Sequence, residues 1–185
     1  MINILLAFAG ITGIGKSYYK DKVCEKLNFS KIKIVTTRAP RIGELNNEDK
    51  IFVTEEQLDK MTNENKIAYQ FELLGVKYAY KKVDLFSSKN TVFEMHYNTI
   101  YDFKKICPNL FSIYLLPTDL NKAKQKLIER RLNAETEKAR LLEIDEHYNR
   151  IKKDKDLIRM FDYVLYNNYD KESEEKVVNL VKENL

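Results

Sequence analysis

The stretch that decides the fold is "GITGIGKS", Gly10 to Ser17, which follows directly on the apolar run "INILLAFA". It satisfies the pattern GxxxxGK[ST] at every fixed position. The run before it is typical of a strand buried on both faces of a parallel sheet, and Tyr19, Val23 and Leu27 after it have helical spacing. A phosphate-binding loop requires this order of strand, loop and helix, so the sequence favours such a loop over an ordinary strand-to-helix turn.

Glycine usage supports the same interpretation. The chain has only 5 glycines, and three of them are Gly10, Gly13 and Gly15. Glycine lets the backbone turn so that successive N–H groups point at phosphate oxygens, and the following helix presents its positive N-terminal end. Lys16 is placed to reach the β- and γ-phosphates, and the Ser17 hydroxyl is placed to bind Mg²⁺. We therefore expect the chain to bind ATP with Mg²⁺.

The composition indicates a single folded domain of 185 residues with a net charge of +4, 44% apolar and 32% charged residues. Its basic residues are mixed with acidic ones, which suits a small anionic ligand and argues against nucleic acid. Cys24 and Cys107 are expected to be reduced thiols. The first apolar run is short and has no preceding Lys or Arg, unlike a signal peptide, and no stretch is long enough for a membrane span. We expect a cytoplasmic protein.

Beyond the first helix, strands and helices alternate, which predicts an α/β fold with a parallel sheet and helices on both faces. Strands are expected at "KIKIV", "TVFEMH", "LFSIYLL" and "YVLYN", with a long charged helix from about Asp119 and a terminal helix. Thr54 begins a capping box that opens a short helix. Residues 37–83 interrupt the alternation, and "KIAYQFELLGVKYAY" there is typical of a hairpin turning at Gly75.

The segment "TTRAPRIGE" places Arg38 and Arg41 three residues apart, with Pro40 stiffening the loop between them. Two guanidinium groups held in this way can grip the oxygens of a terminal phosphate. Solvated arginines in a surface loop are the simpler alternative. A phosphate-binding loop upstream favours a second phosphate that faces the first.

With this loop, "TTRAPRxGE" and then "D-x-x-F-V", the sequence resembles the guanylate kinase family over nearly its whole length. The resemblance implies a P-loop NTPase-type core (residues 1–36 and 84–185), an inserted β-rich acceptor-binding flap (about 37–83) and a helical lid (about 129–140). It also implies transfer of the ATP γ-phosphate to GMP or dGMP. By position, Arg130 and Arg140 match the lid arginines, which would act with Lys16 and Arg41 in catalysis, and Asn167 matches an adenine-contacting residue.

The acceptor-base pocket departs from the family pattern. Guanylate kinases contact guanine with an acid on the flap hairpin, a hydroxyl and an aspartate, and the aligned positions here are Tyr69, Tyr80 and His96. Neither Tyr nor neutral His accepts from guanine N1–H and N2–H together, as a carboxylate does. Glu72 is the nearest acid, but a shift of three residues along a strand turns it to the opposite face unless a bulge intervenes.

Other positions of the family pattern are partly kept. Ile34 replaces a serine, and Lys50 replaces a tyrosine that contacts the acceptor phosphate. Lys50 can still donate a hydrogen bond to that phosphate. Tyr78 is retained as a second phosphate contact. Glu94 aligns with an aspartate that helps organise Mg²⁺, which implies a metal site formed with Ser17.

Three hypotheses follow. The first is a kinase of guanylate kinase type that acts on GMP or dGMP. The second is a related kinase with another acceptor, such as another nucleotide or a ribose phosphate, motivated by Lys50, Tyr69 and His96. The third is a binding module of the same fold without catalysis, which the intact Lys16 and Ser17 disfavour.

Overall fold

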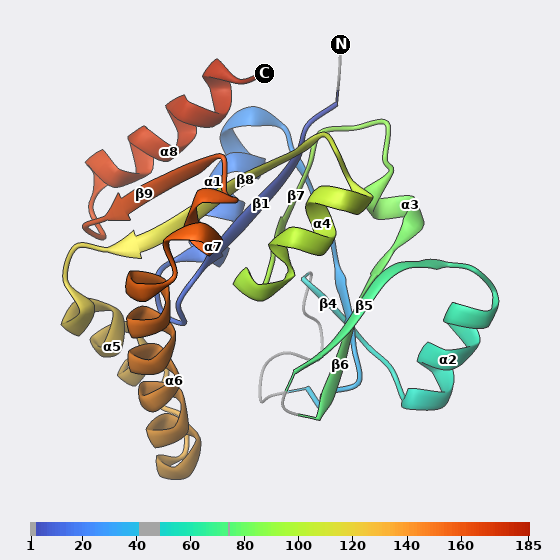
Figure 1. Cartoon of the computed structure of the whole chain (residues 1–185), viewed down its shortest axis with the longest axis horizontal. Helices are drawn as coiled ribbons and strands as arrows, with labels where there is room; N and C mark the ends of the chain where they lie inside the picture. The colour runs from blue at the N-terminus through green and yellow to red at the C-terminus, as the bar shows by residue number, and fades with distance from the viewer. Residues whose placement is uncertain (1–2, 41–48, 74) are drawn as a thin grey trace.

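The structure, a computed structural model, describes residues 3–40, 49–73 and 75–185. Its centre is a five-stranded sheet in which every pair of neighbouring strands is parallel (Figure 1). In spatial order the strands are β2 (Ser30–Lys31), β7 (Thr91–Glu94), β1 (Leu5–Gly10), β8 (Leu110–Pro117) and β9 (Tyr163–Asn167). The predicted parallel α/β sheet is therefore confirmed.

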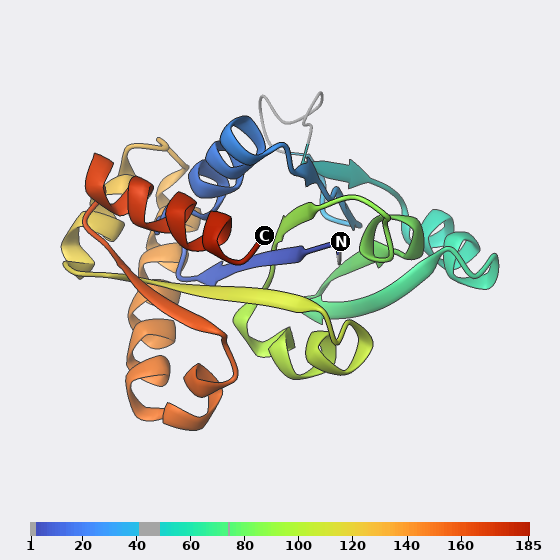
Figure 2. The ribbon, with the colours of Figure 1, turned by 90° about the horizontal axis from the view of Figure 1, so that it is seen from above.

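Helices cover both faces of this sheet, as Figure 2 shows, with α1 and α8 on one face and α4 on the other. Apart from one helix that packs on a second sheet described below, the helices are α1 (Lys16–Leu27), α3 (Lys82–Leu85), η1 (Tyr97–Thr99), α4 (Ile100–Ile106), α5 (Leu120–Ile128), α6 (Ala134–Lys153), α7 (Lys155–Arg159) and α8 (Lys171–Glu183). No helix within the described residues is long and apolar enough to cross a membrane.

Strand β1 is buried along its whole length because its side chains alternate between two cores. Leu6 and Phe8 pack in the cluster that includes residues of α1, α5 and α8. Leu5 and Ala7 pack in the other cluster, which includes residues of α4 and the aromatic side chains of the second sheet. A strand with two buried faces needs a continuous apolar run, which is the pattern seen in the sequence.

A second sheet is built from the middle of the chain. Its strands, in spatial order, are β4 (Lys50–Phe52), β3 (Ile34–Thr36), β6 (Val76–Lys81) and β5 (Ile67–Leu73). Helix α2 (Glu55–Asn63) packs on one face of it through Leu58, and the predicted capping box at Thr54 is present with both of its hydrogen bonds. The β5–β6 hairpin turns at Gly75, where φ is 72°.

Two predictions of secondary structure were wrong in detail. "KIKIV" is not one strand but is shared between β2 in the central sheet and β3 in the second sheet. The expected long helix from Asp119 is two helices, because Arg131 adopts a positive φ of 51° after α5 and Asn133 caps a new helix α6. The chain can therefore change direction between the two helices.

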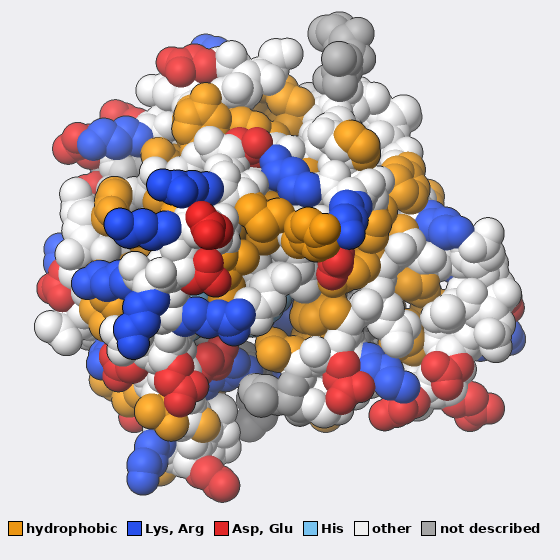
Figure 3. Space-filling view, in the orientation of Figure 1, with side chains coloured by type: hydrophobic (Ala, Val, Ile, Leu, Met, Phe, Trp, Pro, Cys, Tyr) orange, Lys and Arg blue, Asp and Glu red, His pale blue; other side chains and the backbone are white. Residues whose placement is uncertain are grey.

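The surface charges are mixed (Figure 3) and the cysteines are unpaired, as the composition predicts. Figure 3 shows Lys and Arg side chains interspersed with Asp and Glu over α6 and α7. Cys24 is half-buried, Cys107 is buried, and both are free thiols.

Candidate active site

The predicted phosphate-binding loop connects β1 to α1 at the carboxyl edge of the parallel sheet. Gly10, Gly13 and Gly15 adopt φ values of 145°, 83° and 94°, which side chains rarely allow. A Cβ atom on Gly13 would lie only 2.5 Å from the carbonyl oxygen of Ala123, and one on Gly10 only 2.6 Å from that of Leu115. The loop therefore needs glycine for its backbone conformation and for close packing against its neighbours.

The N-terminus of α1 is left open to an anion. Gly15 caps it without a side-chain hydrogen bond, and its first turn contains no acidic residue. Helices α2, α6 and α8 differ, because a side chain caps each of them and Glu occurs in each first turn. The exposed N–H groups and the positive end of the helix dipole of α1 suit a phosphate group.

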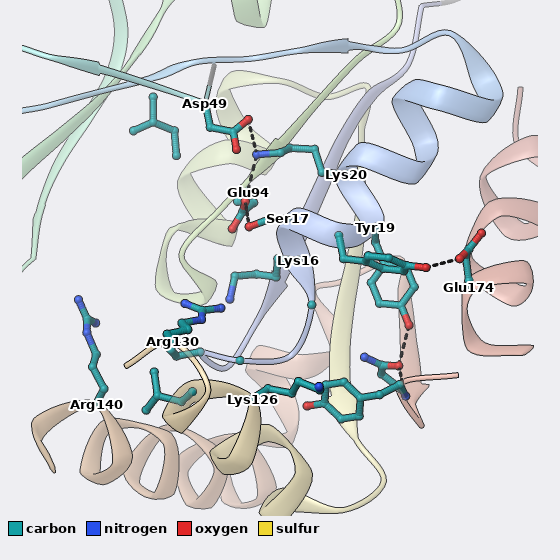
Figure 4. A pocket seen from close by; sticks show the side chains of 18 of the residues that line it. Lys16, Ser17, Tyr19, Lys20, Asp49, Glu94, Lys126, Arg130, Arg140 and Glu174 are labelled. Carbon is teal, nitrogen blue, oxygen red and sulfur yellow. Dashed lines mark hydrogen bonds and ion pairs between the residues drawn. The ribbon is translucent and has the colours of Figure 1, made fainter. Parts of the chain in front are cut away.

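Lys16 and Arg130 lie together at this loop, and Arg140 lies farther away on α6 (Figure 4). The Lys16 ammonium donates to the carbonyl oxygens of Gly10 and Ile11, both at 2.9 Å, and burial lowers its pKa below the ordinary value. In Figure 4 the Arg130 guanidinium lies beside Lys16, and Arg140 extends from α6 toward the same opening. Positive charge is therefore concentrated where the phosphates of a nucleotide would lie.

Oxygen ligands suitable for a metal ion begin at Ser17, the residue directly after Lys16. Ser17 Oγ donates to Glu94 Oε1 at 2.8 Å, at the end of the adjacent strand β7. Partial burial alone would raise the pKa of Glu94, but Lys20 and Lys16 outweigh it and the pKa lies below its ordinary value. A hydroxyl beside an ionised carboxylate is the oxygen donor set that Mg²⁺ prefers.

The loop is braced from β9 by Asn167, which is almost fully buried. Its amide nitrogen donates to the Ile14 carbonyl at 2.8 Å, and its amide oxygen accepts from the Tyr19 hydroxyl at 2.6 Å and from the Tyr169 N–H at 2.7 Å. The adenine contact expected at this position stays a prediction, and the structure adds a bracing contact that sequence reasoning missed.

Asn167→Ala is expected to lower the free energy of unfolding by about 2 kcal/mol, because the buried Ile14 carbonyl and Tyr19 hydroxyl both lose a partner. Urea denaturation at pH 7 measures this loss. The exposed neighbour Asn168 is the matched control, and Asn168→Ala should change stability by less than about 0.5 kcal/mol. Equal losses in the two variants would contradict the bracing role.

A cavity of about 1050 Å³ connects this loop to the second sheet. Its lining includes Gly15, Lys16, Ser17, Glu94, Arg130, Arg140 and Asn167 on one side and Ile34, Asp49 and Lys50 on the other. The register of the second sheet places Lys50, Ile34 and Tyr78 on the same face. Ile34 pairs with Lys50, and Thr36, two residues further and therefore on the same face, pairs with Phe52 and Tyr78.

Of the two predicted acceptor arginines, Arg38 lies within the described residues. Arg38 is half-buried, donates to the Ala39 carbonyl at 2.8 Å, and its guanidinium carbon lies 5.5 Å from the centre of the Phe52 ring. Arg41 lies outside the described residues.

The predicted base-pocket residues are not all brought together. Tyr69 pairs with Tyr80 across the hairpin, and both face the central core. Their hydroxyls bond within the chain, Tyr69 to Asp102 at 2.7 Å and Tyr80 to the Glu94 carbonyl at 3.0 Å. Glu72 is exposed and pairs with Lys77 on the opposite face, as strand alternation predicts.

His96 lies two residues after the end of β7, among several neighbouring rings. Its Nδ1 accepts from the Asn98 N–H at 3.3 Å, and its ring centre lies 6.3 Å from that of Phe71. His147 of α6 is buried, stacks on Tyr97 at 3.6 Å and shares a hydrogen bond of 2.8 Å with a tyrosine of β8. Burial lowers the pKa of His96 to about 4 and that of His147 to about 3.

These histidines should make the protein less stable in mild acid. Between pH 6.5 and 4 the unfolded chain binds protons at both rings that the folded chain excludes, so stability falls as pH falls. Each ring contributes up to about 1.4 kcal/mol per pH unit. Urea titrations from pH 6.5 to 5 should show about half of this slope in His147→Gln, and parallel profiles in the variant and the wild type would contradict the assignment. Glu94 loses its contribution to stability mainly as pH falls below its ordinary pKa of 4.5, which lies below the range of pH 6.5 to 5 used in the titrations.

Comparisons with known proteins agree with the geometry. The family model described as guanylate kinase matches residues 4–184. A guanylate kinase from Lactobacillus johnsonii is 30% identical over 134 residues, which cover 69% of this chain and 66% of that protein. One from Bacillus subtilis is 29% identical over 174 residues, 89% of this chain and 81% of that protein. The crystal structure of guanylate kinase from Anaplasma phagocytophilum has the same fold, with a TM-score of 0.74 and 20% identity over 99% of this chain and 86% of that chain.

Proposed function

The chain belongs to the guanylate kinase family, and on that premise we propose that it transfers the γ-phosphate of ATP to GMP or dGMP, with release of ADP and GDP or dGDP. The observation that carries the proposal is the cavity between the phosphate-binding loop and Lys50. Lys16 and Arg130 line it on the loop side and Lys50 lines it on the side of the second sheet, so a cation is available to each of two phosphate groups that must approach each other.

The donor side binds ATP. The loop N–H groups and Lys16 hold its β- and γ-phosphates, and Arg130 and Arg140 neutralise the charge that moves during transfer. Ser17 and Glu94 would hold Mg²⁺, which offsets charge on the β- and γ-oxygens when it is bound. The close approach of their two oxygens supports this assignment.

The acceptor side binds the nucleoside monophosphate. Arg38, Arg41, Lys50 and Tyr78 hold its phosphate. His96 is the remaining candidate for a contact with its base, because Tyr69 and Tyr80 face the core. An oxygen of the acceptor phosphate attacks the γ-phosphorus in line, and the bond from that phosphorus to the β–γ bridging oxygen breaks, so ADP leaves with the electron pair. No general base is needed, because the attacking oxygen is already anionic.

Two segments, a flap and a lid, close over the substrates in the proposed reaction. Residues of about 37–83, which contain most of the second sheet and its helix α2, form an acceptor-binding flap on the core. Residues 129–140, which comprise the turn after α5 and the first part of α6, form the lid that brings Arg130 and Arg140 to the phosphates. Closure of both excludes water from the phosphoryl group. The free thiols and the two nucleotide substrates support a cytoplasmic location.

The test is release of ADP from ATP and Mg²⁺ in a coupled assay with GMP, dGMP, AMP, IMP, CMP, UMP and ribose phosphates as acceptors. Turnover is expected with GMP and dGMP. Turnover with a ribose phosphate and none with GMP would favour a different kinase, and inactivity with every acceptor would contradict the proposed activity. Addition of EDTA should stop turnover.

A further inference from the structure

Lys20 is a charged side chain in an unusual position. It lies on α1 one turn after Lys16, and only 3% of its side chain is exposed. Lysine is almost never this buried without a charged partner, because its ammonium group loses its hydration. Sequence reasoning did not single out this residue, because a lysine in the first turns of a helix is ordinary.

The Lys20 ammonium bridges two carboxylates. It lies 3.0 Å from Glu94 Oε1 and 2.9 Å from Asp49 Oδ1, as the dashed lines in Figure 4 show. The two acids raise the pKa of Lys20 above its ordinary value although burial opposes them, so the bridge is ionic at neutral pH. Lys31 approaches Asp49 less closely, at 3.9 Å.

The two carboxylates belong to different sheets. Glu94 ends β7 of the central sheet, and Asp49 immediately precedes β4 of the second sheet, where its carbonyl oxygen accepts from the Ile34 N–H at 3.0 Å. Lys20 is therefore a cross-link between the helix that follows the phosphate-binding loop, the central sheet and the second sheet.

Each carboxylate also adjoins a group that the proposed function uses. Ser17 donates to the same Glu94 oxygen that Lys20 contacts. Asp49 is followed directly by Lys50, which lines the cavity. A change in the position of the Lys20 ammonium would therefore move both sides of the transfer site.

We propose that Lys20 is a positioning residue that sets the separation between the metal-binding carboxylate Glu94 and the acceptor-binding strand β4. The inference rests on the proposed function and deepens it. Lys20 itself touches no substrate. It acts by keeping the acceptor phosphate in line with the γ-phosphate, and errors of about 1 Å in such alignment can slow a reaction about a hundredfold.

The experiment measures Lys20→Met and Asp49→Ala beside Lys22→Met, a control that removes the same charge from a solvent-facing ion pair with Glu25 on the same helix. Calorimetric titration with GMP, without ATP or Mg²⁺, should show affinity about tenfold weaker for both test variants. Steady-state assays should show a higher KM for GMP and a lower kcat, with the KM for ATP changed less. Lys20→Arg should restore part of the loss, and Lys22→Met should match the wild type.

The double variant Lys20→Met with Asp49→Ala separates coupling from two independent defects. If the bridge acts as one unit, the double variant loses little more affinity for GMP than either single variant. Additive losses would overturn the proposal, as would a folded Lys20→Met protein that keeps wild-type affinity, kcat and KM and loses only thermal stability. If Lys20→Met does not fold, a wild-type GMP affinity of Asp49→Ala overturns the proposal and a tenfold loss supports it.

The proposed activity and the role of Lys20 can be disproved separately. A wild-type protein that neither binds nor phosphorylates GMP would remove the proposed function and this inference with it. A wild-type protein that is active, with Lys20→Met indistinguishable from it, removes only the inference.

Discussion

Replacing Lys16 by methionine is expected to lower kcat for phosphoryl transfer by about a thousandfold while the protein stays folded. Lys16 lies at the start of α1 among loop N–H groups, and in the proposed function it carries the charge nearest the transferring phosphate. Removal of one preorganised charged or donor group from such a site typically costs a hundredfold to a thousandfold or more, since roughly 3–4 kcal/mol of transition-state stabilisation is lost.

The stability of this variant separates a chemical role from a structural one. Burial lowers the pKa of Lys16, so its charge costs the folded state free energy, whereas its hydrogen bonds to the Gly10 and Ile11 carbonyls stabilise that state. Methionine of similar shape removes both, so the midpoint of thermal unfolding should change only slightly. Single-turnover assays and thermal unfolding of the same samples check both parts. A Lys16→Met protein that retains a tenth or more of wild-type kcat would contradict the role assigned to Lys16.

Replacing Arg140 by methionine is expected to lower kcat by about a hundredfold to a thousandfold with little change in the KM for GMP. Arg140 is held on α6 by an ion pair with Glu143 at 2.5 Å, and it is one of the residues that line the cavity. A guanidinium that offsets charge mainly in the transition state affects kcat more than ground-state binding.

Arg159 provides a matched control for Arg140. It forms the same kind of pair, with Asp156 three residues earlier, but on an exposed helix, with 74% of its side chain accessible. Arg159→Met should keep wild-type kcat and KM. Stopped-flow or steady-state kinetics with ATP and GMP measure both variants, and equal kcat values would show that Arg140 is only a surface charge.

The elements near the phosphate-binding loop could be predicted from sequence because their signals are local. An apolar run long enough for a strand, glycines at fixed intervals and a following helical pattern all lie within residues 2–27. Thr54 and Gln57 likewise carry the complete chemistry of a capping box within four residues. The two errors arose where a local pattern fits more than one structure. "KIKIV" can form a strand of either sheet, and the charged segment after Asp119 fits one long helix or two.

Placement of the candidate acceptor side needed the register of the second sheet. Strand alternation alone indicates that Glu72 and Tyr69 lie on opposite faces, but only the pairing of β5 with β6 shows which face is directed to the core. The hydroxyls of Tyr69 and Tyr80 could not be assigned from sequence, because their partners Asp102 and Glu94 lie 33 and 14 residues away.

By itself the sequence determined a parallel α/β fold, a phosphate-binding loop at Gly10 to Ser17 and a family resemblance that the comparisons confirm. Each of these depends on short-range spacing along the chain. Only the tertiary structure decided that Lys20 joins Glu94 to Asp49 and that Asn167 braces the loop, since these contacts span 74, 29 and about 150 residues of sequence. Tertiary packing brings such groups together, and no local pattern records it.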